Sequence, residues 1–568
     1  MTSILLTNKQ GGFVWLDGVP ESRHQGLFFR LGNKVFKTLV DFSVSEPLRA
    51  VTNNLWGVRR DYDSTSQRLV MPHRTNSLIV EFSSPAKTDL LLDCKLIDDN
   101  REWGRYYDVK QENGCIVVSY NKKNDTRDNN AVCKDEYRLF VAVAGDFGFS
   151  PAKSWVEQHY PYDSSRKSPP YSRWVFNAGS LIGKKFVVSA ALTEKKAVAE
   201  AKKVLKQSDY LVKRQAEKVA EVTHIIAVMP ERIRSAYQCA CNALDSLSVC
   251  DDGLYAGIPW FYQFWLRDEV ISANALRIIS REKLVKKILL RHLSGLRKKV
   301  LPAAYGGHSL KTADGPGWLA LRYLQHKDLF SKREQSEAEK KLRNAFNSLK
   351  GRMQNGLVMN GPLETWMDTS VDGRDTREGA RIEIQALVLA LAKALGEKEF
   401  CKTLEQRVRE TFWNGSYLYD GASDPTIRPN VFIAAYVYPK LLSREQWETC
   451  FDAVLPRLWL RWGGISSIDI NHELFTDHYT GQDNVSYHRG DSWFWLNNLA
   501  ALVLYRTNAA KYKRFIEKIV EASSHEILEL GAIGHHAELS SARALSSNGC
   551  VSQAWSSAMF IELCSELF

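Results

Sequence analysis

A tryptophan stands two residues before a carboxylate in the turn-rich segment that follows residue 360. The tryptophan is Trp366 and the carboxylate is Asp368. An aromatic ring in this position can hold the apolar face of a sugar, and it also desolvates the carboxyl group, which then keeps a proton that it can donate. A second carboxylate, Glu538, lies far along the chain and precedes Trp555. Two carboxylates, each with a tryptophan nearby, suit glycoside hydrolysis. For either motif alone, a tryptophan that packs beside a helix cap is the simpler interpretation.

Aromatic and charged residues gather in the same way in five segments between expected helices. The segments are 260–268, 314–318, 366–368, 487–493 and 538–555. Arg267 and Asp268 could together hold neighbouring hydroxyls of a sugar, because each sugar oxygen can both donate and accept. An Arg–Asp pair that caps a helix explains them equally well. His488 could bond a further hydroxyl or could be a satisfied structural histidine. Because stacking and directed hydrogen bonds hold neutral polar ligands, these segments predict a sugar site.

The composition is that of an ordinary globular protein. The chain has 568 residues, of which 44% are hydrophobic and 25% charged, and this length allows about two to four domains. No apolar run approaches the roughly 20 residues of a membrane helix, and the N-terminus lacks the features of a secretory signal. Ten scattered cysteines predict reduced thiols in a cytoplasmic protein rather than a metal site. We expect no metal, no organic cofactor and no membrane partner.

The net charge of +11 raises the possibility of a nucleic-acid partner. The basic residues alternate with apolar ones at helical spacing, for example between residues 283 and 291, which is typical of the solvated outer face of a helix. No Gly-rich phosphate loop and no zinc finger accompanies them. The charge pattern therefore predicts outer helix faces and no nucleic-acid binding.

The residue pattern changes near residue 192, from strand-like to helix-like. Residues 1–192 contain short β-branched and aromatic runs separated by turns, which predicts an antiparallel β-sandwich. Residues 193–222 form a charged segment free of proline, for which we expect a helical linker. Residues 223–568 read as successive helices, two of them apolar enough to be buried on more than one side. Paired helices with functional loops between them predict an all-α toroid with its site at one end.

Ordered motifs in the second region resemble the glucosidase domain of glycogen debranching enzymes, the amylo-α-1,6-glucosidases. The motifs are 265–268 (Trp-Leu-Arg-Asp), 365–368 (Thr-Trp-Met-Asp), 377–387, 487–493 and 549–556. Residues 6–13 and 23–27 are similar to the β-rich leading domain of the short prokaryotic and archaeal members. Each motif alone is weak, but their order along the chain is that of the family.

The resemblance implies an (α/α)6 barrel with an inverting α-glucosidase site. Asp368 resembles the family's general acid and Glu538 its general base, while Glu364 is a rival for the acid. Arg267 and Asp268 look like the residues that hold the nonreducing glucose. Together with the clusters above, the predicted substrate-binding residues are Trp260, Trp265, Arg267, Asp268, Asp314, Trp318, Trp366, Glu383, Tyr487, His488, Trp493, Gln553 and Trp555.

The expected activity is removal of α-1,6-linked glucose from glycogen or limit dextrin, so that the partner is an α-glucan. Another α-glucosidase of the same toroid type, a glucoamylase or a trehalase, is the first alternative. A catalytically silent polysaccharide-binding protein is the second, because Val388-Leu389-Ala390 stand where the family has aromatic and Asn positions.

Overall fold

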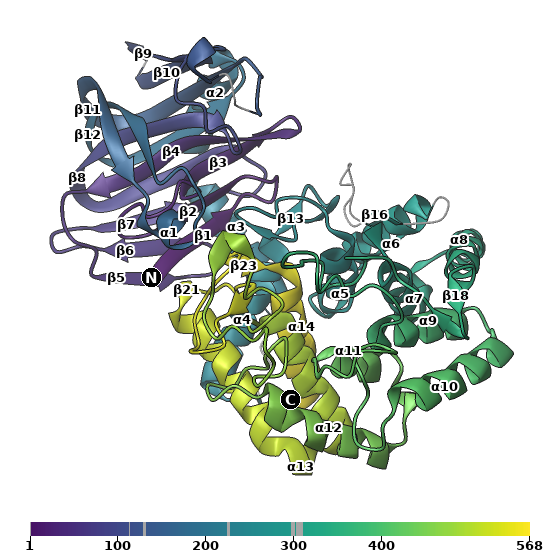
Figure 1. Cartoon of the computed structure of the whole chain (residues 1–568). Coiled ribbons are helices and arrows are strands. Elements are labelled where there is room, and N and C mark those ends of the chain that lie inside the picture. Colours follow the sequence, from purple (N-terminus) through teal and green to yellow (C-terminus); the bar gives the residue numbers. More distant parts are fainter. Residues whose placement is uncertain (1, 113, 129–131, 224–227, 297–300, 303–310) are drawn as a thin grey trace. The chain divides into compact units, whose positions relative to one another are not determined.

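The computed structural model describes the chain except residues 1, 113, 129–131, 224–227, 297–300 and 303–310 (Figure 1). Its internal contacts divide it into two compact units. The first comprises Met1–Val222, Ser246–Cys250 and Ala532–Gly534, and the second comprises Thr223–Asp245, Asp251–Gly531 and His535–Phe568. The first is rich in strands and the second in helices, which confirms that a sheet-rich region precedes a helical one.

In the first unit, the strands β1 to β12 are hydrogen-bonded into one sheet. They are β1 (Thr2–Thr7), β2 (Phe13–Leu16), β3 (Gly26–Leu31), β4 (Lys34–Val44), β5 (Ala50–Asn53), β6 (Val58–Asp61), β7 (Ser66–Val70), β8 (Ser77–Leu96), β9 (Arg105–Glu112), β10 (Cys115–Lys122), β11 (Tyr137–His159) and β12 (Ser172–Ala191). Neighbours such as β11 and β12 run antiparallel. Three strands are much longer than the short runs of the sequence suggest, because bulges, as between Asp146 and Phe147, interrupt their register without ending them.

One face of this sheet encloses the core of the first unit, and helices cover part of the other. Alternate residues, such as Val14 and Leu16 of β2, point into a continuous apolar cluster, as the two-residue period of a strand requires. Helix α1 (Pro161–Ser165) precedes β12, and α2 (Glu194–Lys206) and α3 (Ser208–Val222) follow it. Ala197 and Ala201, one helical turn apart, pack α2 against Ala142 and Ala144 of β11.

The expectation of a helical linker over residues 193–222 needs correction. These residues belong with the sheet-rich unit. The reason is the alanine stripe of α2, which is small and apolar enough to lie directly on the sheet. A charged, proline-free segment therefore does not distinguish a connector from a helix that packs by one narrow face.

The second unit contains helices α4 to α14. They are α4 (Glu231–Ser246), α5 (Leu266–Ile278), α6 (Glu282–Gly295), α7 (Gly315–Gln325), α8 (Lys332–Lys350), α9 (Ile382–Ala394), α10 (Lys398–Phe412), α11 (Asn430–Val437), α12 (Arg444–Leu458), α13 (Phe494–Glu529) and α14 (Ala554–Leu567). Helix α13 breaks at Asn508, where the backbone is not helical. Two-residue strands join the loops between them, including β15 (Gly257–Ile258) with β23 (Ser552–Gln553), and β20 (Ser492–Trp493) with β22 (Leu539–Ser540).

Six of these helices form a closed ring within the described residues. Helix α5 contacts α7, which contacts α9, and the series continues through α11, α13 and α14 back to α5. In α9, 11 of 13 residues are buried, whereas α10 buries only Cys401, Leu404, Val408 and Phe412, one stripe at helical spacing. Helix α9 of the ring is thus apolar on all sides, and α10 packs against it with one face.

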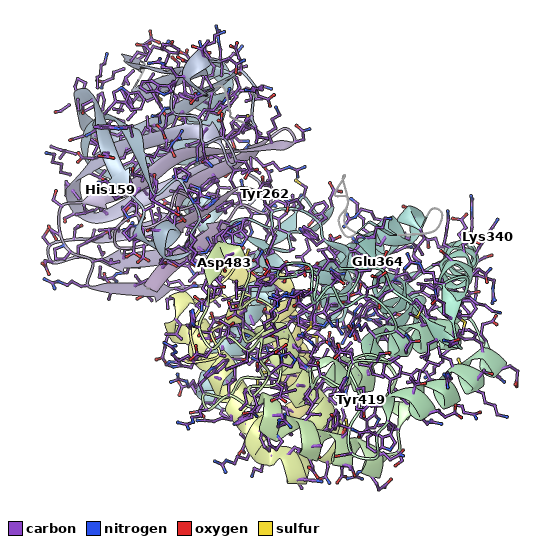
Figure 2. All side chains as sticks on the ribbon, in the orientation of Figure 1. His159, Tyr262, Lys340, Glu364, Tyr419 and Asp483 are labelled. Carbon is purple, nitrogen blue, oxygen red and sulfur yellow. The ribbon has the colours of Figure 1, made fainter. Side chains whose placement is uncertain are left out.

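Among the described helices, none combines the length and apolarity that crossing a membrane requires. Figure 2 shows the side chains that fill both units, and it labels Glu364 among the helices of the second.

Candidate active site

The N-terminal ends of the ring helices are brought together by side chains that lie in or beside their first turns. Arg267 in the first turn of α5 donates from Nε to Asp314, the residue before α7, at 2.9 Å. Gln553, the residue before α14, donates to Asp268 at 2.8 Å. Trp366 donates from its indole Nε1 to Asn430 at the start of α11, at 2.7 Å. A helix start cannot continue the backbone ladder, so polar side chains concentrate there and meet at one end of the ring.

Asp368 is a carboxyl group with limited access to solvent. Its side chain is 24% exposed, and its Oδ2 accepts from Arg267 Nη1 at 2.8 Å. Burial raises the pKa of Asp368 above its ordinary value, the charge on Asp314 adds to this, and the Arg267 guanidinium opposes it. The balance favours a carboxyl group that holds its proton at higher pH than a free aspartate.

Glu364, the rival acid, has the opposite electrostatic environment. It accepts from Arg352 Nη2 at 3.1 Å and from the backbone N–H of Gly361 at 2.8 Å. Burial alone would raise the pKa of Glu364, but the bonds from Arg352 and Gly361 outweigh it and hold the pKa below its ordinary value. Glu364 is therefore suited to a permanent ion pair rather than to proton donation.

Glu538 lies in a more enclosed environment than Asp368. The whole residue is 1% exposed. The Tyr487 hydroxyl donates to Oε1, and the backbone N–H of Cys550 donates to Oε2 at 2.9 Å. Gly549 has a φ of +71°, and a Cβ there would collide with Oε2, so glycine at this position lets the backbone approach the carboxylate closely. Two donors stabilise the charged form of Glu538.

Tyr487 bonds Glu538 and lies within electrostatic range of Asp368. Burial raises its pKa well above the ordinary value, the charge of Glu538 adds to this, and Asp368 contributes as well. The short strands β20 and β22 pair Trp493 with Leu539, and this pairing sets the loop that carries Tyr487 beside the segment that carries Glu538.

An aromatic cluster lines the same region. The Trp366 ring meets His488 at 5.4 Å, Trp493 at 5.4 Å and Trp495 at 5.2 Å between ring centres, each edge to face. Trp555 stacks on Trp495 at 4.9 Å. The sequence interpretation missed Trp495, although the Trp-Phe-Trp run at 493–495 offered a signal.

Three of the predicted residues carry buried polar atoms that have no hydrogen-bond partner among the described residues. The atoms are His488 Nε2, Gln553 Oε1 and Trp555 Nε1. Buried polar groups are nearly always paired in folded proteins. Their concentration in one region indicates where a ligand rich in hydroxyl groups would form hydrogen bonds.

The sequence profile of the amylo-alpha-1,6-glucosidase family matches residues 235–562. The chain belongs to this family. That finding confirms the resemblance inferred from the ordered motifs, and it makes the protein a glycoside hydrolase. No curated protein sequence matches the chain significantly.

Solved structures match this family member at low sequence identity. A bacterial glucoamylase in complex with acarbose is 11% identical, with a TM-score of 0.62 and coverage of 99% of this chain and 93% of the other. A glycosidase in complex with glucose is 13% identical, with a TM-score of 0.47 and coverage of 60% and 99%. At 11% identity, the similarity to the glucoamylase concerns the fold alone.

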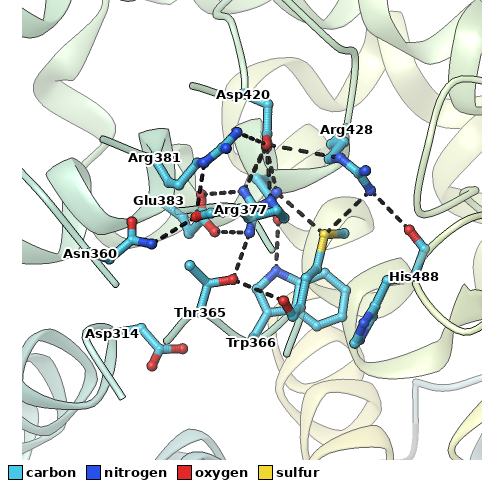
Figure 3. A network of polar contacts seen from close by, with 12 residues as sticks. Asp314, Asn360, Thr365, Trp366, Arg377, Arg381, Glu383, Asp420, Arg428 and His488 are labelled. Atoms are coloured by element: carbon cyan, nitrogen blue, oxygen red, sulfur yellow. Dashed lines mark hydrogen bonds and ion pairs between the residues drawn. The ribbon is translucent and has the colours of Figure 1, made fainter. Parts of the chain in front are cut away.

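Glu383, which we predicted to bind substrate, is instead part of a buried ion network (Figure 3). Arg377 donates to both of its carboxylate oxygens, at 2.7 and 3.2 Å. The same guanidinium binds Asp420 at 2.8 Å and Thr365 Oγ1 at 2.7 Å. In this amylo-α-1,6-glucosidase family member, Arg377 therefore occupies both carboxylate oxygens of Glu383, whose side chain is 1% exposed.

Trp318 also lies away from the cluster. It is buried inside the ring, where it packs against Tyr436 of α11 at 6.0 Å. Its position in the first turn of α7 suggested a site residue, but the helix turns that side chain inward. Trp260 and Trp265 are partly exposed in the loop before α5, and Asp268 lies buried in the first turn of α5 with its pKa raised by burial to about 8.

Within the described ranges, no group of three or more histidine, cysteine, aspartate or glutamate side chains has a metal-binding arrangement. Asp368 and Glu538 are carboxyl groups, which can donate a proton when protonated and accept one when ionised.

Proposed function

We propose that this protein is an inverting amylo-α-1,6-glucosidase that removes α-1,6-linked glucose from glycogen or limit-dextrin branches. The observation that carries the proposal is the difference between its two carboxyl groups. Asp368 is partly exposed with a raised pKa, whereas Glu538 is buried and accepts two hydrogen bonds. A pair of carboxyl groups with separated environments suits an acid and a base. The ring of six helices and its covering helices would then be an (α/α)6 toroid.

In the proposed reaction Asp368 donates its proton to the glycosidic oxygen, which leaves with the rest of the glucan. Glu538 removes a proton from a water molecule on the opposite face of the sugar, and the water oxygen bonds to the anomeric carbon as the glycosidic bond breaks. Room for that water requires carboxyl groups roughly 6.5–9.5 Å apart. The product is β-glucose from an α-linked substrate.

The aromatic cluster would supply the surface on which the glucose ring rests. Trp366, Trp493 and Trp555 offer apolar faces, and the free polar atoms of His488, Gln553 and Trp555 would pair with sugar hydroxyls. We place Asp268 beside the same sugar, where its protonated form could donate a hydrogen bond. A cytoplasmic storage glucan would be the natural substrate.

A glucoamylase activity on α-1,4 linkages is the second candidate. It is supported by the similarity in fold to a glucoamylase solved with acarbose, and a trehalase is a further possibility of the same type. A silent polysaccharide-binding protein would keep the aromatic cluster and lack turnover.

The test is glucose release from a phosphorylase-trimmed branched dextrin, followed by NMR at the anomeric protons. Immediate appearance of β-glucose is the expected result. Matched incubations with isomaltose, maltose and trehalose assign the linkage. Release of α-glucose first would contradict inversion, and no release from any of the four substrates would favour a binding protein.

A further inference from the structure

A polar pocket of about 470 Å3 lies within the sheet-rich unit. It is bounded by the end of β3, the segment before β8 and one side of α2, and its lining includes Arg30, Asn76, Lys196 and Lys203. All of these residues belong to the first unit. The volume is within the range of small-molecule sites, roughly 300–1,000 Å3.

Helix α2 uses two neighbouring stripes for different purposes. Ala197, Ala201 and Val204 pack against the sheet. Lys196, Glu200 and Lys203, at i, i+4 and i+7, lie on one adjoining stripe and line the pocket. Ala199 between them is small, so the helix leaves space where it faces the pocket.

Three of the lining groups are cationic and only one is anionic. Arg30, Lys196 and Lys203 form no ion pair with a described residue, whereas most arginine side chains of the chain have carboxylate partners within 4.0 Å. Glu200, the one carboxylate, accepts from the backbone N–H of Asn76 at 3.4 Å and so is partly occupied. These four residues give the lining a formal charge of +2.

We propose that this pocket binds the phosphate monoester of a small polar metabolite. A phosphate monoester carries about −1.5 to −2 charges at neutral pH, which matches the formal excess of the lining. Charge-assisted hydrogen bonds from Arg and Lys are the usual means of holding its oxygens. The side-chain amides of Gln10 and Asn76 lie in the same lining and can bond the hydroxyl groups of the remaining part of the ligand.

The proposal concerns a site in the first unit and does not depend on the hydrolase activity of the second. The ester could be a sugar phosphate or a nucleoside monophosphate, since both present the same phosphate group. Isothermal titration calorimetry of the full chain with glucose 6-phosphate and with 5′-AMP separates these sources, and inorganic phosphate and unmodified glucose complete the set.

The expected result is saturable binding of at least one ester with a Kd below about 1 mM at low ionic strength, and no binding of glucose. The double variant Lys196→Ala/Lys203→Ala should weaken that binding at least about tenfold, because it removes two charge-assisted contacts. Arg30→Ala should weaken it as well. Added sodium chloride should also reduce affinity.

The matched control is Lys202→Ala/Lys206→Ala on the same helix. Both lysines are exposed and lie outside the lining, so the control removes equal charge without touching the pocket. An unchanged Kd in this control, with circular dichroism unchanged in both double variants, supports the site. Three results would overturn it: no saturable binding of either ester, equal losses in the two double variants, or inorganic phosphate binding as tightly as both esters.

Discussion

Two clusters of arginine and carboxylate lie close together in the second unit, and they differ in what their carboxyl groups can reach. In the cluster around Arg377, both Glu383 and Asp420 are almost fully buried and accept from the guanidinium. In the cluster around Arg267, Asp314 is equally buried, but Asp368 keeps 24% of its side chain exposed. In the first cluster the carboxylates are buried and paired with the arginine. In the second, the Asp368 carboxyl group remains accessible to a substrate.

Under the proposed mechanism, the buried Arg377 cluster has a structural role and the Arg267 cluster a chemical one. The Arg377 guanidinium bonds Thr365, next to Trp366, and Asn430 bonds both Trp366 and Asp420. The cluster around Arg377, which we call the closed cluster, thus fixes the segment that carries Asp368; the cluster around Arg267 is the open cluster. Figure 3 shows the contacts of Arg377 with Thr365 and its other neighbours. Precise placement of a reacting group requires such support behind it.

The largest expected effect is a loss of turnover when Asp368, the accessible carboxyl group of the open cluster, is replaced. The variant Asp368→Asn keeps the shape of the side chain and removes the proton that the glycosidic oxygen would receive, so kcat should fall by about 10²–10⁴-fold. The melting temperature should stay close to that of the unmodified protein. Glucose release and thermal unfolding, measured on the same preparations, check both parts.

The control for this variant is Glu364→Gln, four residues earlier. Because Glu364 is held as an ion-pair partner of Arg352, its replacement should cost stability more than turnover. If Asp368→Asn retained near-normal turnover and Glu364→Gln lost it, the acid would be Glu364 and our assignment would be wrong.

The next largest effect is a loss of stability when Arg377, the cation of the closed cluster, is replaced. Arg377→Met leaves Glu383 buried without its cation and leaves Asp420 with only the longer ion pairs to Arg381 and Arg428, at 3.2 and 3.9 Å. The loss should destabilise the fold by about 3–5 kcal/mol. Chemical denaturation measures this loss. Arg374→Met, three residues earlier and exposed in a loose pair with Asp372, should change the free energy of unfolding by no more than about 0.5 kcal/mol. Equal effects of the two variants would contradict a structural role for the Arg377 cluster.

The sequence predicted the members of the open cluster better than those of the closed one. Arg267, Asp268 and Asp368 stand in motifs whose residue types and order are specific. The pairing of Glu383 with Arg377 was not predicted, because the two lie six residues apart across a turn, where no helical or strand spacing predicts a pair. Asp420 was missed for a similar reason, since 43 residues separate it from Arg377. Pairing over such separations depends on how the ring closes, which the local pattern does not contain.

The fold was predicted in the same uneven way. The period of strands and helices distinguished the two units, and the apolar character of residues 382–394 predicted a helix buried on several sides. The alanine stripe of α2 could not be distinguished from a linker, because charged residues surround it and the sheet that it covers comes from distant segments.

A smaller effect on kcat/KM is expected when Glu538, the proposed base, loses the hydrogen bond from Tyr487. Tyr487→Phe removes the hydroxyl that donates to Glu538 but keeps the ring among its aromatic neighbours. A hydrogen bond to a charged group contributes about 1.5–3 kcal/mol, so kcat/KM should fall by about 10–100-fold. The acid limb of its pH profile should move to higher pH, because the carboxylate loses a donor that stabilises its charged form. An unchanged acid limb together with the loss of rate would assign Tyr487 to substrate binding alone.

The smallest effect tests whether burial raises the pKa of Asp268 and so makes stability depend on pH. Burial raises the pKa of Asp268 to about 8, so the folded protein holds a proton there that the unfolded chain releases above its ordinary value of 3.8. Stability should therefore fall as pH rises between about 4 and 8. Asp268→Asn removes this penalty and should increase the free energy of unfolding at pH 8, with no gain at pH 4. Urea unfolding at the two pH values measures it.

Asp375 provides the control of opposite sign. Burial alone would raise the pKa of Asp375, but the hydrogen bond from Arg489 outweighs it, and the net effect is a pKa below the ordinary value. Its contribution to stability is present above that ordinary value and is lost as pH falls through the depressed pKa. Asp375→Asn should therefore destabilise the protein at pH 8 and less so in acid. If both variants shifted stability in the same direction at pH 8, burial and ion pairing would not be the causes that separate these two carboxyl groups.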